Sequence, residues 1–153
     1  MNCVPLVAAL LFPLMCLPDV AVKEISRDRI LSAGPEWQKN YDEFQPEAER
    51  IAALRSRLGD NLRIDVYLGL WCSDSRAQVP PFLKILDAIG APIPVRYFAV
   101  ERKTDKGIRY YVGHLQVERV PTFIFYRGDR GIGRIVENPE VGLCEDMLEI
   151  LSK

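Results

Sequence analysis

The spacing of hydrophobic and polar residues predicts a chain of alternating strands and helices. Residues 64–70 form an apolar run interrupted by Asp65, which is typical of a buried strand, and the strand is expected over 63–70. Residues 94–100 alternate in a period of two, with both faces apolar enough for a sheet covered on two sides. Residues 120–126 are a proline followed by a strand, and residues 127–131 form the turn to a return strand at 132–136.

Helical spacing separates and flanks these strands. A helix is expected to begin after Cys72, to be kinked near its middle by Pro80 and Pro81, and to end at Gly90. A short helix is expected at 104–112. The last helix is expected to carry Pro139 in its first turn. Its predicted buried residues are Leu143, Met147, Ile150 and Leu151.

Ahead of the first strand, Pro35 begins another helical pattern. Trp37, Tyr41 and Phe44 share one face of it, and a turn-rich helical stretch follows at 47–58. The element order is therefore β-α-β-α-β-β-α after an N-terminal helical segment. It predicts an α/β fold, with a central mixed sheet of about four strands flanked by helices.

These elements suggest a division of the chain into four parts. Residues 1–22 are interpreted as a signal peptide or a disordered N-terminus, and 23–34 as a polar linker. Residues 35–61 are interpreted as an N-terminal helical extension, and 62–153 as the main domain. The apolar stretch 4–17 is shorter than the ~20 residues of a membrane span. It suits a signal-peptide core, although Met1-Asn2-Cys3 lacks the usual basic residue.

This N-terminus bears on where the protein acts. Cys16 follows Leu14-Met15 instead of a small residue, which weighs against lipidation. An exported or periplasmic location is favoured over a cytoplasmic one. Contact with a membrane is expected only if the N-terminal stretch is retained.

Composition narrows the function classes. The 153 residues carry a net charge of −1, which gives no field for steering nucleic acid. The four cysteines, at 3, 16, 72 and 144, have no metal-like spacing, and His114 is the single histidine. We therefore expect neither a metal site nor a nucleic-acid partner.

The chemistry centres on Cys72, which the pattern places at a strand-to-helix junction. The amides and positive dipole end of a helix favour the thiolate, the form that attacks disulfides. Ser75 lies one helical turn on and can donate its hydroxyl hydrogen to that thiolate. Arg76 adds positive potential near the sulfur, whereas Asp74 opposes it.

Three features together resemble the thioredoxin superfamily. Trp71-Cys72-x-x-Ser75 stands where that family carries Trp-Cys-x-x-Cys, and Pro80 matches its kink proline. Val120-Pro121-Thr122 matches the loop whose proline is cis in the family and faces the reactive cysteine. The resemblance covers roughly residues 62–152.

Within the superfamily, the chain is similar to a bacterial branch with a Trp-Cys-Ser-Asp-Ser motif. That branch also has a helix with Trp and Tyr ahead of the domain, as Trp37 and Tyr41 stand here. The resemblance implies that Trp71 shields the sulfur and that Val120 and Pro121 shape the substrate groove.

The chain departs from the family pattern at two positions. Ser75 replaces the resolving cysteine, so no disulfide can form within the motif. The family's buried acid lies six residues before the reactive cysteine, where this chain has Val66. Asp65 is one position away and points to the opposite face of the strand, so the acid's role is not carried over to it.

Two functions from different classes follow. The first is a monothiol protein acting in thiol–disulfide exchange through Cys72, by mixed disulfide formation, deglutathionylation or isomerisation. Cys144, on a distant helix, is not expected to resolve the mixed disulfide. An external thiol such as glutathione would release it, and the partners would be proteins or small molecules with thiols or disulfides. The alternative is a non-catalytic module that binds extended peptide in the Pro121 groove.

Overall fold

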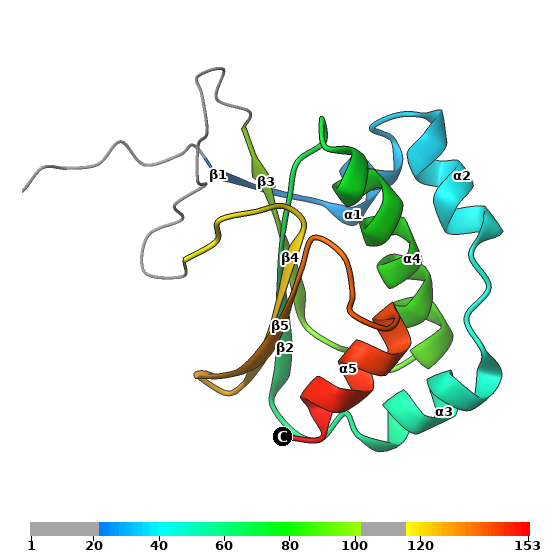
Figure 1. The fold of residues 1–153 in the computed structure, drawn as a ribbon, viewed down its shortest axis with the longest axis vertical. Coiled ribbons are helices and arrows are strands. Elements are labelled where there is room, and N and C mark those ends of the chain that lie inside the picture. Colours follow the sequence, from blue (N-terminus) through cyan, green and yellow to red (C-terminus); the bar gives the residue numbers. More distant parts are fainter. Residues whose placement is uncertain (1–21, 102–115) are drawn as a thin grey trace, which may run out of the picture.

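The computed structural model describes residues 22–101 and 116–153, and it is built on a five-stranded mixed sheet (Figure 1). The strand order is β1-β3-β2-β4-β5. The strands are β1 (Val22–Ile25), β2 (Leu62–Leu68), β3 (Val95–Val100), β4 (Thr122–Arg127) and β5 (Arg130–Val136). The helices are α1 (Arg27–Leu31), α2 (Pro35–Glu43), α3 (Ala48–Ser56), α4 (Ser73–Ile89) and α5 (Leu143–Leu151). This mixed α/β architecture is the one that the resemblance implied.

Strand β2 is the centre of the sheet and carries the chain to the cysteine. It pairs in parallel with β3 and antiparallel with β4. Its residues alternate in direction, so Ile64, Val66 and Leu68 enter the main core while Asp65 and Tyr67 face the other side. Burial on both faces explains the near-continuous apolar run in the sequence.

The described helices all cover one face of the sheet (Figure 1). Helix α4 lies against that face with Phe82 and Leu83 fully buried, and the Phe82 ring packs 4.8 Å from the ring of Phe123 on β4. Helix α4 runs continuously through Pro80 and Pro81. It ends, as expected, at Gly90, whose φ of 66° lies in the left-handed region that glycine enters without a Cβ clash.

A three-residue network joins the N-terminal helices to α4. Arg27 of α1 and Tyr41 of α2 both donate hydrogen bonds to the Asp87 carboxylate near the end of α4. The hydrogen bond from Arg27 is the main cause that lowers the pKa of Asp87, despite the opposing effect of burial. The N-terminal segment is therefore fixed to the helix that begins at the cysteine.

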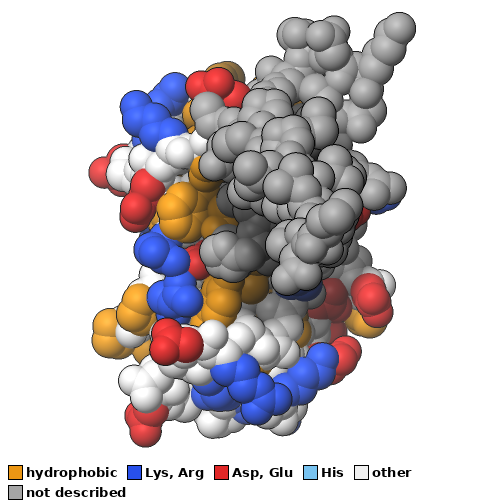
Figure 2. Space-filling view, turned by 90° about the vertical axis from the view of Figure 1, so that its left-hand side faces the viewer, with side chains coloured by type: hydrophobic (Ala, Val, Ile, Leu, Met, Phe, Trp, Pro, Cys, Tyr) orange, Lys and Arg blue, Asp and Glu red, His pale blue; other side chains and the backbone are white. Residues whose placement is uncertain are grey.

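The face of the sheet away from these helices carries a smaller cluster, in which apolar residues surround a buried carboxylate. Its buried apolar residues are Tyr67, Cys72, Val100, Val117, Val120, Ile124 and Tyr126. Asp65 lies among them with 2% exposure and accepts hydrogen bonds from Arg63 and, through both oxygens, from Arg96. Figure 2 looks onto this face, where basic side chains lie among hydrophobic ones.

Several sequence expectations need correction. The interpretation of 23–34 as a linker is wrong, because β1 and α1 form within it and β1 pairs antiparallel with β3. This strand is the fifth member of a sheet expected to have about four. Helix α5 starts at Leu143, after the predicted Pro139, because the Asp146 carboxylate accepts backbone N–H groups at 140–142 and holds them as a loop. The helix expected at 104–112 and His114 lie outside the described residues.

Two further findings concern the described helices and the described metal-ligating side chains. None of the helices among them combines the length and the apolar character needed to cross a bilayer. The same residues contain no group of three or more His, Cys, Asp or Glu side chains placed to hold a metal ion.

Candidate functional site

Cys72 lies at the N-cap of α4, directly after the end of β2. Its backbone is extended, its N–H donates to the Gly69 carbonyl at 2.9 Å, and its carbonyl accepts from the Arg76 N–H at 3.1 Å. The residue is 8% exposed. This position is the strand-to-helix junction that the sequence predicts, and it places the thiol beside the free N–H groups of the first helical turn.

The sulfur contacts the proline loop, as the resemblance implied. Cys72 Sγ donates a hydrogen bond to the Val120 carbonyl at 3.3 Å, and the Val120–Pro121 peptide bond is cis. These two segments are 48 residues apart in the chain. Val120 and Pro121 are both buried, so it is their backbone that borders the thiol.

Hydrogen bonds on both sides hold the proline loop. Thr122 Oγ1 donates to the Arg119 carbonyl at 2.6 Å, and the Glu137 N–H donates to the Pro121 carbonyl at 2.7 Å. The Arg119 guanidinium pairs with the Glu137 carboxylate at 2.6 Å. The loop that carries the Val120 carbonyl is therefore held on one side by the start of β4 and on the other by the residue after β5.

Ser75 lies one turn into α4 with its side chain fully buried. Its Oγ accepts a hydrogen bond from the Gly69 N–H at 3.1 Å, so the serine closes the loop between β2 and α4. From the sequence, the Ser75 hydroxyl is expected to donate its hydrogen to the Cys72 thiolate. The bond to Gly69 uses the acceptor side of the oxygen, so the donor role stays a prediction.

Trp71 packs over the loop and reaches toward β3. Its indole Nε1 donates to the Val100 carbonyl at 3.0 Å, and the residue is 40% exposed. A Cβ added to Gly69 would come within 2.8 Å of the indole ring, so the absence of a side chain at Gly69 allows the ring to lie flat against the loop. The sequence shows a Trp beside the cysteine, but not that it is anchored to β3.

The two charged residues of the motif differ in their surroundings. Arg76 pairs with Glu36 of α2 at 2.9 Å, while Asn40 of the same helix donates to the Arg76 carbonyl at 2.8 Å. The positive potential expected from Arg76 is therefore partly offset by Glu36. Asp74 lies half-buried in the first turn of α4, where an acidic side chain is favourable for the helix.

Cys144, the other described cysteine, lies in different surroundings from Cys72. Both thiols are free, and Cys144 is buried on α5 within the main core, whereas Cys72 belongs to the cluster on the opposite face of the sheet. Burial raises the pKa of Cys144 to about 11. It is therefore a protonated core thiol, which agrees with the expectation that it is no resolving partner.

Sequence reasoning missed a pocket next to the site. An opening of about 680 Å³ lies between β1, the start of α1 and the Trp71 side chain. Its lining residues are Lys23, Glu24, Ile25, Ser26, Arg29, Leu70, Trp71, Ala99, Val100 and Glu101. No signal in the sequence pointed to it, because half of these residues lie in the stretch taken for a linker.

Comparisons with known proteins agree with this geometry. The family model described as thioredoxin matches residues 22–146, which includes β1, the cysteine and the proline loop. No curated protein and no solved structure matches the chain. Because the family model spans most of its length and the strands, cysteine and proline loop stand as described, the chain belongs to the thioredoxin family.

Proposed function

We propose that this protein is a monothiol thiol–disulfide exchange protein in which Cys72 is the nucleophile. The observation that carries the proposal is the contact between Cys72 Sγ and the Val120 carbonyl at the start of α4. The sulfur lies at a helix N-terminus and beside a backbone acceptor that an extended substrate can use.

In the first step, the Cys72 thiolate attacks one sulfur of a substrate disulfide. A bond forms between Cys72 and that sulfur, and the other substrate sulfur leaves as a thiolate. Once Cys72 has lost its proton, it no longer donates to the Val120 carbonyl. That carbonyl is then available to accept an N–H from the substrate backbone.

The second step needs a thiol from outside the chain. Ser75 stands where a second thiol would stand, and Cys144 lies buried in the main core. An external thiolate therefore attacks the mixed disulfide, restores the Cys72 thiolate and leaves with the substrate sulfur as a new disulfide. With glutathione on one side of the exchange, the reaction is glutathionylation or deglutathionylation of a partner.

The test uses oxidised glutathione and intact-mass spectrometry, with Cys3 and Cys16 replaced by Ser so that the readout falls on Cys72. We expect one glutathione adduct on Cys72, which reduced glutathione then removes. The matched control, Cys72→Ser in the same background, should form no adduct. An unmodified Cys72 under conditions that modify free cysteine would contradict the proposal.

One observation favours the alternative of a non-catalytic binding module. Cys72 is only 8% exposed and its thiol already has an acceptor in Val120, which are features of an unreactive structural cysteine. On this alternative, the Cys72→Ser variant would bind peptide partners as well as the original protein does, and no covalent adduct would be trapped on Cys72.

A further inference from the structure

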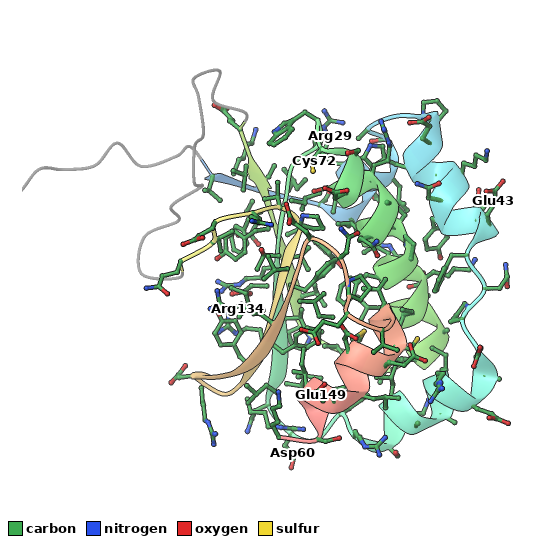
Figure 3. The ribbon with its side chains drawn as sticks, viewed as in Figure 1. Arg29, Glu43, Asp60, Cys72, Arg134 and Glu149 are labelled. Atoms are coloured by element: carbon green, nitrogen blue, oxygen red, sulfur yellow. The ribbon has the colours of Figure 1, made fainter. Side chains whose placement is uncertain are left out.

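The pocket beside Trp71 shares a wall with the candidate active site. Trp71 directly precedes Cys72, and its indole lines the pocket while anchored to the Val100 carbonyl. Figure 3 labels Arg29 and Cys72 at the same end of the molecule, opposite to Asp60. A molecule in this pocket therefore lies against the residue next to the nucleophile.

The pocket has apolar walls, and more of the positive than of the negative side chains that line it face into it. Ile25, Leu70 and Trp71 supply the apolar surface, while Lys23 and Arg29 supply two cations. Glu24 lines the pocket too, but β1 alternates in direction and Glu24 pairs with Phe98, whose ring stacks on Tyr67 at the opposite face. Of the two lining acids, Glu101 is thus left to offset the two cations.

Arg29 differs from the other arginines around the site. Arg76 is paired with Glu36, and Arg119 with Glu137. Within residues 22–101 and 116–153, Arg29 has no carboxylate within salt-bridge distance, although it lines a pocket. A guanidinium in such a place binds carboxylates well, because its N–H donors match two oxygens at once.

The volume indicates the size of the occupant. About 680 Å³ falls in the range of ~300–1,000 Å³ that is usual for small-molecule sites. A flat protein interface would instead bury roughly 800 Å² on each partner. The combination of an indole wall, aliphatic side chains and the two cations of Lys23 and Arg29 fits a small molecule with an apolar body and a carboxylate.

We propose that the pocket lined by Arg29 and Trp71 binds the carboxylate arm of a small thiol or disulfide whose sulfur reacts at Cys72. The inference rests on the proposed function and names its substrate class. The bond changes are those of the exchange itself: the Cys72 thiolate displaces one sulfur of the small disulfide as a thiolate. Arg29 acts as a specificity residue that pairs with the carboxylate and takes no part in the bond changes.

The first test compares two small disulfides in single-turnover reactions with Cys72, in the Cys3→Ser, Cys16→Ser background. One is 5,5′-dithiobis(2-nitrobenzoate), which carries a carboxylate on each ring, and the other is the uncharged 4,4′-dithiodipyridine. We expect Arg29→Ala to slow the anionic probe by about threefold to tenfold and to leave the neutral probe unchanged, as for loss of one charge-assisted hydrogen-bonded pair.

Two variants make the comparison specific. Arg29→Lys keeps a cation in the pocket and should recover part of the rate. Arg130→Ala removes the same charge from the first residue of β5, and it should change neither rate, because the β4–β5 turn lies at the end of the sheet away from the start of α4 (Figure 1). If Arg29→Ala slows both probes equally, or slows neither, the pocket is not a carboxylate site and the inference is overturned.

The second test measures binding alone, with a ligand and a variant that cannot undergo disulfide exchange. S-methylglutathione, which carries carboxylates and cannot exchange, is titrated into the Cys72→Ser protein by calorimetry, with and without Arg29→Ala. Binding that is lost with Arg29→Ala supports a carboxylate site in the pocket; if Cys72 is nevertheless unreactive, the proposed function fails and with it the reaction of the bound molecule at Cys72. If both probes react at Cys72 at rates that Arg29→Ala leaves unchanged, and S-methylglutathione does not bind, the inference fails and the proposed function stands.

Discussion

Replacing Ser75 with Cys is expected to create insulin-reducing activity. Cys72 and Ser75 occupy the N-cap and the third position of α4, so their Cα atoms are one helical turn apart. That separation is about 5–6 Å and falls within the range that a disulfide bridges. A second thiol there can attack the mixed disulfide from within and release the reduced substrate.

The assay follows precipitation of insulin B chain with dithiothreitol as reductant, and a rise of at least about tenfold over the parent is expected because resolution becomes intramolecular. The matched control is Cys72→Ser with Ser75→Cys, which leaves the motif with a single thiol, at the fully buried position 75, and should be inactive. The loss of the Gly69–Ser75 hydrogen bond should cost about 1 kcal/mol of folding stability. A stable Ser75→Cys protein with no gain would show that the sulfur at 72 is badly placed.

Of the substitutions discussed, Asp65→Asn is expected to lower the free energy of unfolding the most. The carboxylate is 2% exposed and accepts from Arg63 at 2.7 Å and from Arg96 at 2.9 and 2.7 Å. Asn keeps the shape but removes the charge and turns one acceptor oxygen into a donor that faces two guanidinium groups. Both arginine side chains are partly exposed and can regain water, which limits the cost to about 1–3 kcal/mol.

The measurement is thermal unfolding followed by circular dichroism, where each kcal/mol lowers the midpoint by about 2–4 °C in a chain of this size. Asp129→Asn, the same change in the exposed β4–β5 turn, is the control and should leave the midpoint within about 1 °C. Equal midpoints for the two variants would mean that the Asp65 cluster contributes nothing to stability.

The local parts of the fold could be predicted because local patterns encode them. A few adjacent residues are enough to predict each of three features: the apolar run of β2, the cysteine at the start of α4 and the left-handed Gly90 at the end of α4. Asp65 also follows from the period of two, which places it on the face opposite to Ile64 and Val66.

Residues that act through distant partners could not be predicted. Strand β1 has two exposed charged residues at its centre and is recognisable as a strand only through its pairing with β3, some 75 residues on. The arginine partners of Asp65, the Glu36 partner of Arg76 and the Gly69 partner of Ser75 depend on the same three-dimensional closure. Arg29 was missed for this reason, since only the folded β1 and α1 bring it to Trp71.

The reactivity of Cys72 is the central claim, and its alkylation rate tests it most directly. The protein, with Cys3 and Cys16 replaced by Ser, is treated with iodoacetamide at pH 6, and modification of each remaining cysteine is followed by peptide mass spectrometry. Cys144 is the internal control: burial raises its pKa to about 11, so at pH 6 it stays protonated and should remain unmodified until the protein is unfolded. We predict that Cys72 is alkylated much faster than free cysteine under the same conditions. A Cys72 that reacts as slowly as free cysteine, or that stays as protected as Cys144, would contradict the account.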